Sequence, residues 1–272
     1  MSAAPKLLGI VNITEDSFSD GGRFLAPDAA LAHARNLLES GADILDLGGA
    51  SSNPEAKPVD PEIEIARLAP VVRAMKAEQR SLSIDSFSIP VQRWAMREHV
   101  DYLNDIRGFP HEELYPELAA SRAKLIVMHS VQGAGRATKI VAEPSKVLDL
   151  VISFFEARIA ALVKAGVARE RLILDPGMGF FLGGNPEASF TVLRRLPTLR
   201  RAFGLPLLVS VSRKSFLRAL TGRPPQEAGP ASLAAELFAI DQGADYVRTH
   251  NPGALRDAIL VRKKLDEGGF VA

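Results

Sequence analysis

Eight short apolar runs alternate along the chain with longer segments whose apolar residues recur at helical spacing. The runs, each about the length of one strand, are KLLGIV, DILDLG, SLSID, DYLND, KLIVMH, RLILD, LPLLVSVS and DYVRTH. Strands that alternate with helices in this way form repeated βα units around a parallel sheet. Eight such units in 272 residues predict an α/β fold, a (β/α)8 or TIM barrel, as a single domain over residues 1–272.

Helix starts and a short internal repeat agree with this pattern. Asp60, Asn185 and Asn251 each place a capping side chain before a proline suited to the first position of a helix. The triplet Gly-Ala-Asp occurs at residues 41–43 and again at 243–245, each time between a predicted helix and a predicted strand. No glycine-rich dinucleotide turn follows the first strand, which favours a closed barrel over a doubly wound open sheet.

The composition excludes several classes of function. Lys and Arg number 33 and Asp and Glu number 32, so the formal charge of +1 offers no footprint for nucleic acid or an anionic membrane. The chain has no cysteine, which excludes disulfides, thiolate zinc sites and a cysteine nucleophile. We find no signal peptide and no membrane-spanning run, and we expect a soluble, cytoplasmic protein with small-molecule substrates, no nucleic-acid partner and no membrane partner.

Polar side chains gather where the predicted strands end. In a barrel of this kind, the active site is built from the C-terminal ends of the strands and the loops after them. In chain order these ends carry Asn12, Asp46, Asp85, Asn104, Asp105, His129, Asp175, Ser212, Lys214, Arg248 and His250. Any one of these residues could simply cap a helix or fold a turn. Together, the carboxylates and amides predict a ligand with amide-like edges, and the cations predict anionic oxygens at its other end.

Eight motifs lie at or near these strand ends: GIVNITEDSFSDGG, GADILDLGGASSNP, LSIDS, LNDIRGF, VMHS, LDPGMGF, SVSRKSFL and VRTH. In this order, from Leu8 to His250, they resemble the motifs of dihydropteroate synthase. The resemblance implies a transferase of folate biosynthesis that joins p-aminobenzoate to (7,8-dihydropterin-6-yl)methyl diphosphate, giving 7,8-dihydropteroate and pyrophosphate. It also implies Mg²⁺ as cofactor and a homodimer formed through the outer helices.

The resemblance also implies which residues bind the pterin and the aminobenzoate. Asp85, Asn104 and Asp175 would bind the pterin, and the carboxylates would stabilise a methylene cation formed as pyrophosphate leaves. Lys214 would reach the pterin carbonyl and line the aminobenzoate site, where Ser215 is available to the aminobenzoate carboxylate. Asp85, Asp175 and Lys214 are therefore expected to be catalytic.

At the diphosphate end, the same resemblance implies that Arg248 and His250 hold the phosphates and that Asn12 gives Mg²⁺ one oxygen. The first loop, TEDSFSDGG, would close over the site and exclude water from the cation. The remaining implied site residues are Asp16, with a catalytic role in that loop, and Ser52, Met128, Phe181 and Thr249 as substrate contacts.

Two departures from the family pattern concern the second loop and the turn after Asp175. Asn53 stands where the family has an arginine, and the turn GMGFFLGGNPE is longer than usual, with a second aromatic residue and no lysine. These changes are similar to those of the sulfonamide-insensitive branch of the family. We therefore hypothesise that Phe180 or Phe181 narrows the aminobenzoate pocket against sulfonamides. The alternative is that both are hydrophobic lids or core fillers.

Two other functions stay open from the sequence. A methyltetrahydrofolate-binding methyltransferase would grip its pterin with similar carboxylates, although SRKSF and RTH argue against it. A non-catalytic pterin-binding protein is compatible with Asn53 and the altered turn. Pyrophosphate release in the presence of both substrates would distinguish the synthase, because binding alone releases none.

Overall fold

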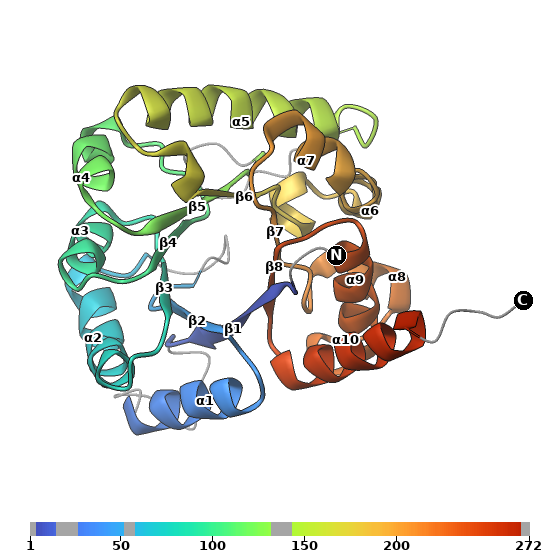
Figure 1. Cartoon of the computed structure of the whole chain (residues 1–272), viewed down its shortest axis with the longest axis horizontal. Coiled ribbons are helices and arrows are strands. Elements are labelled where there is room, and N and C mark those ends of the chain that lie inside the picture. Colours follow the sequence, from blue (N-terminus) through green and yellow to red (C-terminus); the bar gives the residue numbers. More distant parts are fainter. Residues whose placement is uncertain (1–3, 15–26, 52–57, 132–142, 268–272) are drawn as a thin grey trace, which may run out of the picture.

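Eight parallel strands form a ring inside a layer of helices in a computed structural model, which describes residues 4–14, 27–51, 58–131 and 143–267 (Figure 1). The strands are β1 (Lys6–Asn12), β2 (Ile44–Gly48), β3 (Leu82–Asp85), β4 (Tyr102–Asp105), β5 (Lys124–Met128), β6 (Leu172–Asp175), β7 (Leu208–Val209) and β8 (Tyr246–Thr249). They pair in the order β6-β5-β4-β3-β2-β1-β8-β7. A parallel bridge between Leu174 and Leu207 joins the two ends of this sheet. The predicted (β/α)8 barrel is confirmed.

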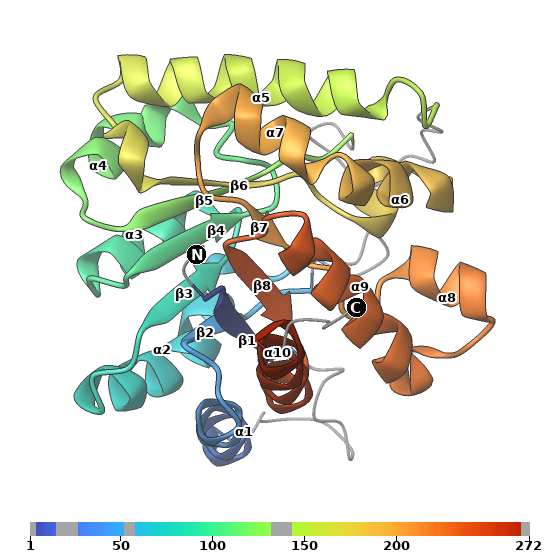
Figure 2. The same cartoon turned by 45° about the vertical axis from the view of Figure 1, so that its right-hand side comes forward.

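The helices cover the outside of the ring. They are α1 (Pro27–Glu39), α2 (Pro61–Ala77), α3 (Ile89–Arg97), α4 (Tyr115–Ala120), α5 (Val147–Lys164), α6 (Pro186–Arg194), α7 (Leu196–Phe203), α8 (Ser215–Thr221), α9 (Gly229–Asp241) and α10 (Pro252–Glu267), with short 3-10 helices η1 (Glu112–Leu114), η2 (Arg169–Arg171), η3 (Gly179–Leu182) and η4 (Pro225–Glu227). Figure 2 shows α8 beside α9 and away from the strands. None of the helices in the described part of the chain has the length and apolarity needed to cross a membrane.

The three predicted capping residues hold the helix starts. Oδ1 of Asp60 and Oδ1 of Asn185 each accept a hydrogen bond from the backbone N–H two residues on, at 2.8 and 3.0 Å. Asn251 accepts one from the backbone N–H of Ala254 at 3.1 Å. The strand predicted from LPLLVSVS is shorter than expected, since its regular pairing is limited to Leu208–Val209. Pro206, just before it, has no N–H to add to the ladder.

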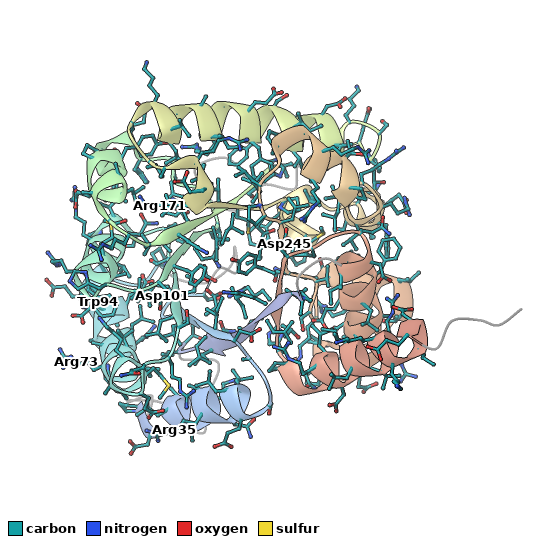
Figure 3. All side chains as sticks on the ribbon, viewed as in Figure 1. Arg35, Arg73, Trp94, Asp101, Arg171 and Asp245 are labelled. Atoms are coloured by element: carbon teal, nitrogen blue, oxygen red, sulfur yellow. The ribbon has the colours of Figure 1, made fainter. Side chains whose placement is uncertain are left out.

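One residue directly before each even-numbered strand clasps that strand to its predecessor. The backbone N–H groups of Leu7, Leu82 and Leu207 donate to Oδ2 of Asp43, Asp101 and Asp245, respectively, at 2.7, 2.9 and 2.9 Å. Each aspartate returns a backbone hydrogen bond to the carbonyl of the same leucine. The residue directly before β6 is Arg171. Its Nη2 donates at 2.6 Å to the carbonyl of Ala123, which directly precedes β5. Figure 3 labels Asp101, Arg171 and Asp245, which surround the ring.

The Gly-Ala-Asp repeat supplies two of these four clasps. Arg256 donates to the glycine carbonyl and the aspartate carboxylate of the first triplet, each at 2.8 Å. Arg200 makes the same two contacts with the second triplet, at 2.8 and 2.7 Å. Gly41 and Gly243 end their helices at φ values of +100° and +93°, which glycine adopts most readily. The sequence repeat is therefore a repeated device that binds an outer helix to a strand pair.

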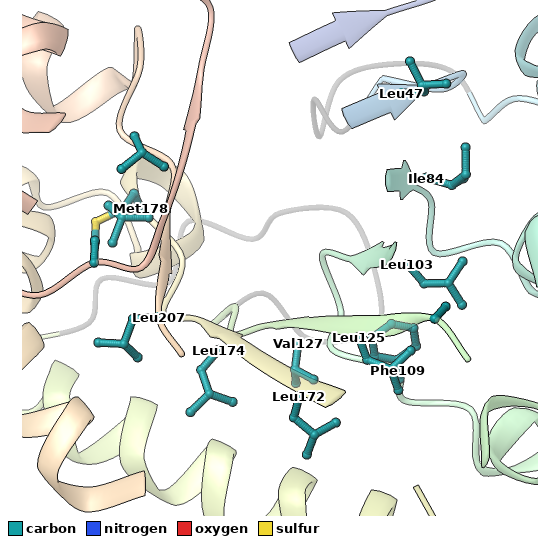
Figure 4. Close-up of a cluster of buried hydrophobic side chains, with 14 of the residues drawn as sticks. Leu47, Ile84, Leu103, Phe109, Leu125, Val127, Leu172, Leu174, Met178 and Leu207 are labelled. Carbon is teal, nitrogen blue, oxygen red and sulfur yellow. The ribbon is translucent and has the colours of Figure 1, made fainter. Parts of the chain in front are cut away.

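Two apolar layers form the core. Residues that alternate along the strands point to opposite faces, so one set packs outward against the helices, including Leu103, Leu172 and Leu174 (Figure 4). Trp94 joins this outer layer. The other set fills the interior near the N-terminal ends of the strands and consists of Leu8, Ile44, Tyr102, Ile126, Ile173, Leu208 and Tyr246.

We expect Ile126→Ala to lower the free energy of unfolding by roughly 2–5 kcal/mol, because Ile126 is fully buried and a cavity would remain. Equilibrium unfolding in urea, followed by the fluorescence of the single tryptophan, measures this change. Leu220→Ala is the matched control, since Leu220 is 71% exposed and should change stability by less than about 0.5 kcal/mol. Equal effects of the two substitutions would contradict a packed interior layer.

Candidate active site

A layer of polar side chains lies on the C-terminal side of the apolar interior. Strand residues two apart face the same side of the sheet. In each even-numbered strand, an apolar residue that faces the interior is followed two positions later by a polar residue that also faces the interior. Asp46, Asn104, Asp175 and Arg248 stand two residues after Ile44, Tyr102, Ile173 and Tyr246. The neighbouring strand β3 adds Asp85, which pairs in register with Asn104. Charged groups thus meet at the mouth of the barrel.

The guanidinium of Arg248 bridges two carboxylates in this layer. Nε donates to Oδ2 of Asp46, and Nη2 donates to Oδ2 of Asp85 at 2.7 Å. Nδ2 of Asn104 donates to the same oxygen of Asp46 at 3.3 Å. Burial opposes the charge of Arg248, but the two carboxylates outweigh it and raise the pKa of Arg248 above its ordinary value. The arginine is therefore a permanent cation inside the barrel.

Three further groups in the layer titrate near neutral pH. Burial raises the pKa of Asp85 to about 7, although Arg248 opposes the shift. Burial also raises the pKa of Asp175 to about 6, against the hydrogen bond from Gly177 and the charge of Lys214. For Lys214, burial and the repulsion of Arg248 lower the pKa to about 8. Shifts of this kind, produced by burial and by named charges in one place, are typical of a functional site.

The turn after β6 orients Asp175. Its Oδ1 accepts a hydrogen bond from the backbone N–H of Gly177 at 2.8 Å. Gly177 has a φ of +74°, and a Cβ there would lie 2.3 Å from the carbonyl oxygen of His129, so only glycine fits. Burial lowers the pKa of His129 to about 4, and its Nδ1 lies 3.1 Å from the carbonyl oxygen of Pro176. His129 is thus a neutral residue that fastens this turn.

The two phenylalanines of the turn differ in position. Phe180 is 56% exposed, whereas Phe181 is half-buried. The Nζ of Lys214 lies 4.9 Å from the centroid of the Phe181 ring. The carbonyl of Phe181 accepts a hydrogen bond from the backbone N–H of Val131 at 2.9 Å, which ties the turn to the end of β5. Phe181 is therefore the phenylalanine beside the charged layer, a choice that the sequence left open.

His250 follows β8 and lies against a buried polar group. Its Nδ1 lies 3.0 Å from Oγ of Ser212, and its backbone N–H donates to the same oxygen at 3.3 Å. Glu236 of α9 is 2% exposed, and hydrogen bonding by the hydroxyl groups of Ser212 and Thr249 opposes the rise in its pKa that burial causes. Sequence reasoning missed Glu236, whose only signal is a carboxylate in the otherwise apolar stretch SLAAELFAI.

Other predicted site residues lie around this layer. Asn12 is exposed at the end of β1, and its Oδ1 would be 3.7 Å from a Cβ built on Gly48. Met128 is buried and pairs in register with Asp175, and Ser215 begins α8 next to Lys214. Thr249 is buried with its hydroxyl bonded to Glu236, so its substrate contact stays a prediction.

Four residues named in the sequence analysis are not assigned to this layer. Asp16, Ser52 and Asn53 lie outside the described residues, and their roles stay predictions. Asp105 accepts hydrogen bonds from the side chain of Gln92 at 2.9 Å and from the backbone of Arg107 at 2.7 Å. These contacts make Asp105 a structural residue.

The raised pKa of Asp175 leads to a pH-dependent prediction. The folded protein binds this proton more tightly than the unfolded chain, so the stability it contributes is present below about pH 4 and is lost as the pH rises through about 6. Asp175→Asn removes the titration and keeps an oxygen for the N–H of Gly177. We expect the variant to be more stable than the unmodified protein by roughly 1–3 kcal/mol at pH 8, and equally stable at pH 4.

Urea unfolding of both proteins at the two pH values measures this difference. A variant that is less stable at pH 8 would show that hydrogen bonds and nearby cations already offset the cost of burying the ionised Asp175 carboxylate.

Comparison with known proteins assigns the barrel to a family. The family model of pterin binding enzymes matches residues 8–250. Dihydropteroate synthase type-2 of Escherichia coli is 58% identical over 261 residues, which are 96% of each chain. The structure of Xanthomonas albilineans dihydropteroate synthase with 4-aminobenzoic acid is 36% identical with a TM-score of 0.88, covering 97% of this chain and 94% of that chain. The structure of dihydropteroate synthase from Xanthomonas albilineans in complex with 7,8-dihydropteroate is 33% identical with a TM-score of 0.84. It also covers 97% of this chain and 94% of that chain. The chain therefore belongs to the dihydropteroate synthases of the pterin binding enzyme family.

Proposed function

We propose that the protein condenses p-aminobenzoate with (7,8-dihydropterin-6-yl)methyl diphosphate and releases 7,8-dihydropteroate and pyrophosphate. The observation that carries this proposal is the buried layer of acceptors at the barrel mouth. Among the described residues, Oδ1 of Asp46 and Oδ1 of Asn104 are buried without a hydrogen-bond partner. Unsatisfied acceptors of this kind are costly unless a ligand brings donors to them.

A dihydropterin offers the donors that this layer lacks. Its amino group and neighbouring ring N–H lie side by side and match the two oxygens of one carboxylate. Asp175 is the carboxylate proposed for this pair, since its raised pKa indicates incomplete compensation in the free protein. Asp85 has one oxygen engaged by Arg248 and the other available to the ligand. Lys214, beside both carboxylates, would donate to the pterin carbonyl.

The reaction follows from the same arrangement. The bond between the pterin methylene carbon and the diphosphate oxygen breaks, and its electron pair leaves with pyrophosphate. Asp85 and Asp175 stabilise the positive charge that develops on the methylene-pterin system. The aminobenzoate nitrogen then forms a bond to the methylene carbon and releases a proton. Arg248 and His250 are proposed to attract the diphosphate end, and no covalent enzyme intermediate is needed.

The residues present fit Mg²⁺ held largely by substrate. In the described part of the chain, no group of three or more His, Cys, Asp or Glu residues could hold a metal ion. Mg²⁺ commonly takes only one or two protein oxygens and fills its shell with phosphate oxygens and water. The exposed Asn12 at the barrel mouth is the proposed protein ligand. When bound, the ion would neutralise charge on the leaving pyrophosphate.

Steady-state release of pyrophosphate, measured with both substrates and Mg²⁺, tests the activity. We expect Asp175→Asn to lower kcat/KM by roughly 10- to 100-fold, because a hydrogen bond to a charged acceptor contributes about 1.5–3 kcal/mol. Arg35→Gln is the control, since Arg35 is exposed and pairs with Glu78 on the outer layer. Absence of pyrophosphate release from the intact protein would favour the non-catalytic pterin-binding alternative or the methyltransferase.

Reduced sulfonamide binding, and hence sulfonamide and antibiotic resistance, is a second part of the proposal. The ring of Phe181 lies under the Nζ of Lys214. This position supports Phe181 as the residue that narrows the aminobenzoate pocket. A flat carboxylate would pass the ring, whereas the tetrahedral sulfur and added substituent of a sulfonamide would meet it. The partial exposure of Phe181 argues against the alternative that it only fills the core.

Sulfonamide inhibition of turnover tests this role of Phe181. We expect Phe181→Ala, and deletion of Phe181, to lower the inhibition constant by roughly 10- to 100-fold, the effect of relieving about 1–3 kcal/mol of steric conflict. Phe180→Ala is the matched control, because Phe180 is 56% exposed and should leave inhibition unchanged. Inhibition constants near the KM for aminobenzoate in the unmodified protein would overturn the pocket role and leave the synthase activity standing.

Assembly and location complete the proposal. A single domain over residues 1–272 is supported by one continuous sheet and one outer core. A homodimer through the outer helices is supported by apolar side chains exposed on α10, namely Leu260, Val261 and Leu265. A cytoplasmic location is part of the proposal, and the absence of cysteine is compatible with it.

A further inference from the structure

A buried glutamate lies behind His250 and has no role in the reaction as proposed above. Glu236 is 2% exposed, and its Oε1 has no hydrogen-bond partner among the described residues. Burial raises its pKa to about 7, against the hydrogen bonds from Thr249 and Ser212. A carboxylate in this condition lowers stability relative to an apolar residue of similar size, so packing alone does not explain it.

The hydroxyl of Ser212 connects this carboxylate to His250. A serine hydroxyl has one hydrogen to donate and two lone pairs with which to accept. The backbone N–H of His250 takes one lone pair, at 3.3 Å. Above about pH 7 Glu236 is ionised and can only accept, so the hydroxyl hydrogen is donated to it. The remaining lone pair must then accept from Nδ1 of His250, which lies 3.0 Å away.

We propose that Glu236 is a positioning residue: through Ser212 it holds the proton of neutral His250 on Nδ1 and leaves Nε2 free to take up a proton when a diphosphate anion binds. The last clause rests on the proposed function, because the anion is the diphosphate of the substrate. In this arrangement the carboxylate, the hydroxyl and the imidazole act as one chain of hydrogen bonds.

The charges around His250 explain why its proton has to be controlled. Burial and the cations Arg213, Arg248 and Lys214, together with His33, lower the pKa of His250 to about 3. The free site therefore keeps His250 neutral at physiological pH. A diphosphate would reverse the sign of the local field and favour imidazolium, whose Nδ1–H is already directed through Ser212 to the ionised Glu236. The site gains a cation only when the anion is present.

The tautomer of His250 can be observed directly. Long-range ¹H–¹⁵N spectra of protein labelled at its five histidines distinguish Nδ1–H from Nε2–H, and His250→Asn assigns the signal. At pH 8.5 the unmodified protein should show Nδ1–H. As the pH falls through about 7, Glu236 takes a proton, Ser212 becomes free to donate to Nδ1, and the signal should move toward Nε2–H.

Two variants should produce the same change at pH 8.5. Glu236→Met removes the acceptor and keeps an unbranched side chain, so Ser212 turns its hydrogen to Nδ1. Ser212→Ala breaks the chain while Glu236 remains. Glu64→Met is the matched control, because Glu64 is another buried glutamate with an unpartnered Oε1 and a serine contact, to Ser86. It should leave the His250 signal unchanged.

Binding of inorganic pyrophosphate with Mg²⁺ tests the second part. In the unmodified protein at pH 7, pyrophosphate should produce the spectrum of a His250 protonated on both nitrogens. Glu236→Met should weaken this binding by roughly tenfold at pH 8, where the charge of His250 depends most on its partner.

The outcomes separate this inference from the proposed function. Nε2–H in the unmodified protein at pH 8.5, or no change in Glu236→Met, would overturn the positioning role even if pyrophosphate is released at the expected rate. Nδ1–H that shifts in both variants, without any binding of pyrophosphate, would confirm the chain of hydrogen bonds and overturn the role of the anion.

Discussion

The buried guanidinium of Arg248 is the charge on which the interior of the barrel depends. Asp46 and Asp85 enter the same small volume from neighbouring strands, and without a cation between them their repulsion would add to the cost of burial. Among the described residues, three carboxyl groups share this layer with two cations, Arg248 and Lys214. Burial raises the pKa of Asp85 and Asp175 against these two cations, and the layer keeps acceptors that a ligand rich in N–H donors would satisfy.

The residues proposed for the reaction and the residues that stabilise the barrel lie at opposite ends of the strands. At the C-terminal end, Asp46, Asp85 and Asp175 are buried at a cost that serves the site. At the N-terminal end, Asp43, Asp101 and Asp245 accept hydrogen bonds from strand backbones and cost far less, because each is also close to solvent or to an arginine. Aspartates thus stabilise the barrel at one end and are proposed to bind the ligand at the other.

Much of this architecture could be predicted from the sequence because strands, helix caps and strand-end polar residues all have short-range signals. The place of Asp175 and Lys214 after apolar runs predicts that they lie at the site, and the family resemblance implies their roles. The pairing of Glu236 with Ser212 could not be predicted, since a helix residue and a loop residue far apart in the chain meet only in three dimensions. Nor could Phe180 and Phe181 be told apart, because a single 3-10 turn is too short to show a period.

The clasps at the N-terminal end divide the barrel into four pairs, β1–β2, β3–β4, β5–β6 and β7–β8. Each clasp joins strands that are neighbours in sequence, so it can form before the ring closes and at a modest cost in chain entropy. The links between pairs, such as the segment from α2 to β3, carry no clasp of this kind in the described part of the chain. New chain ends opened in such a link would leave every pair intact, which makes these links the natural points for circular permutation of the fold.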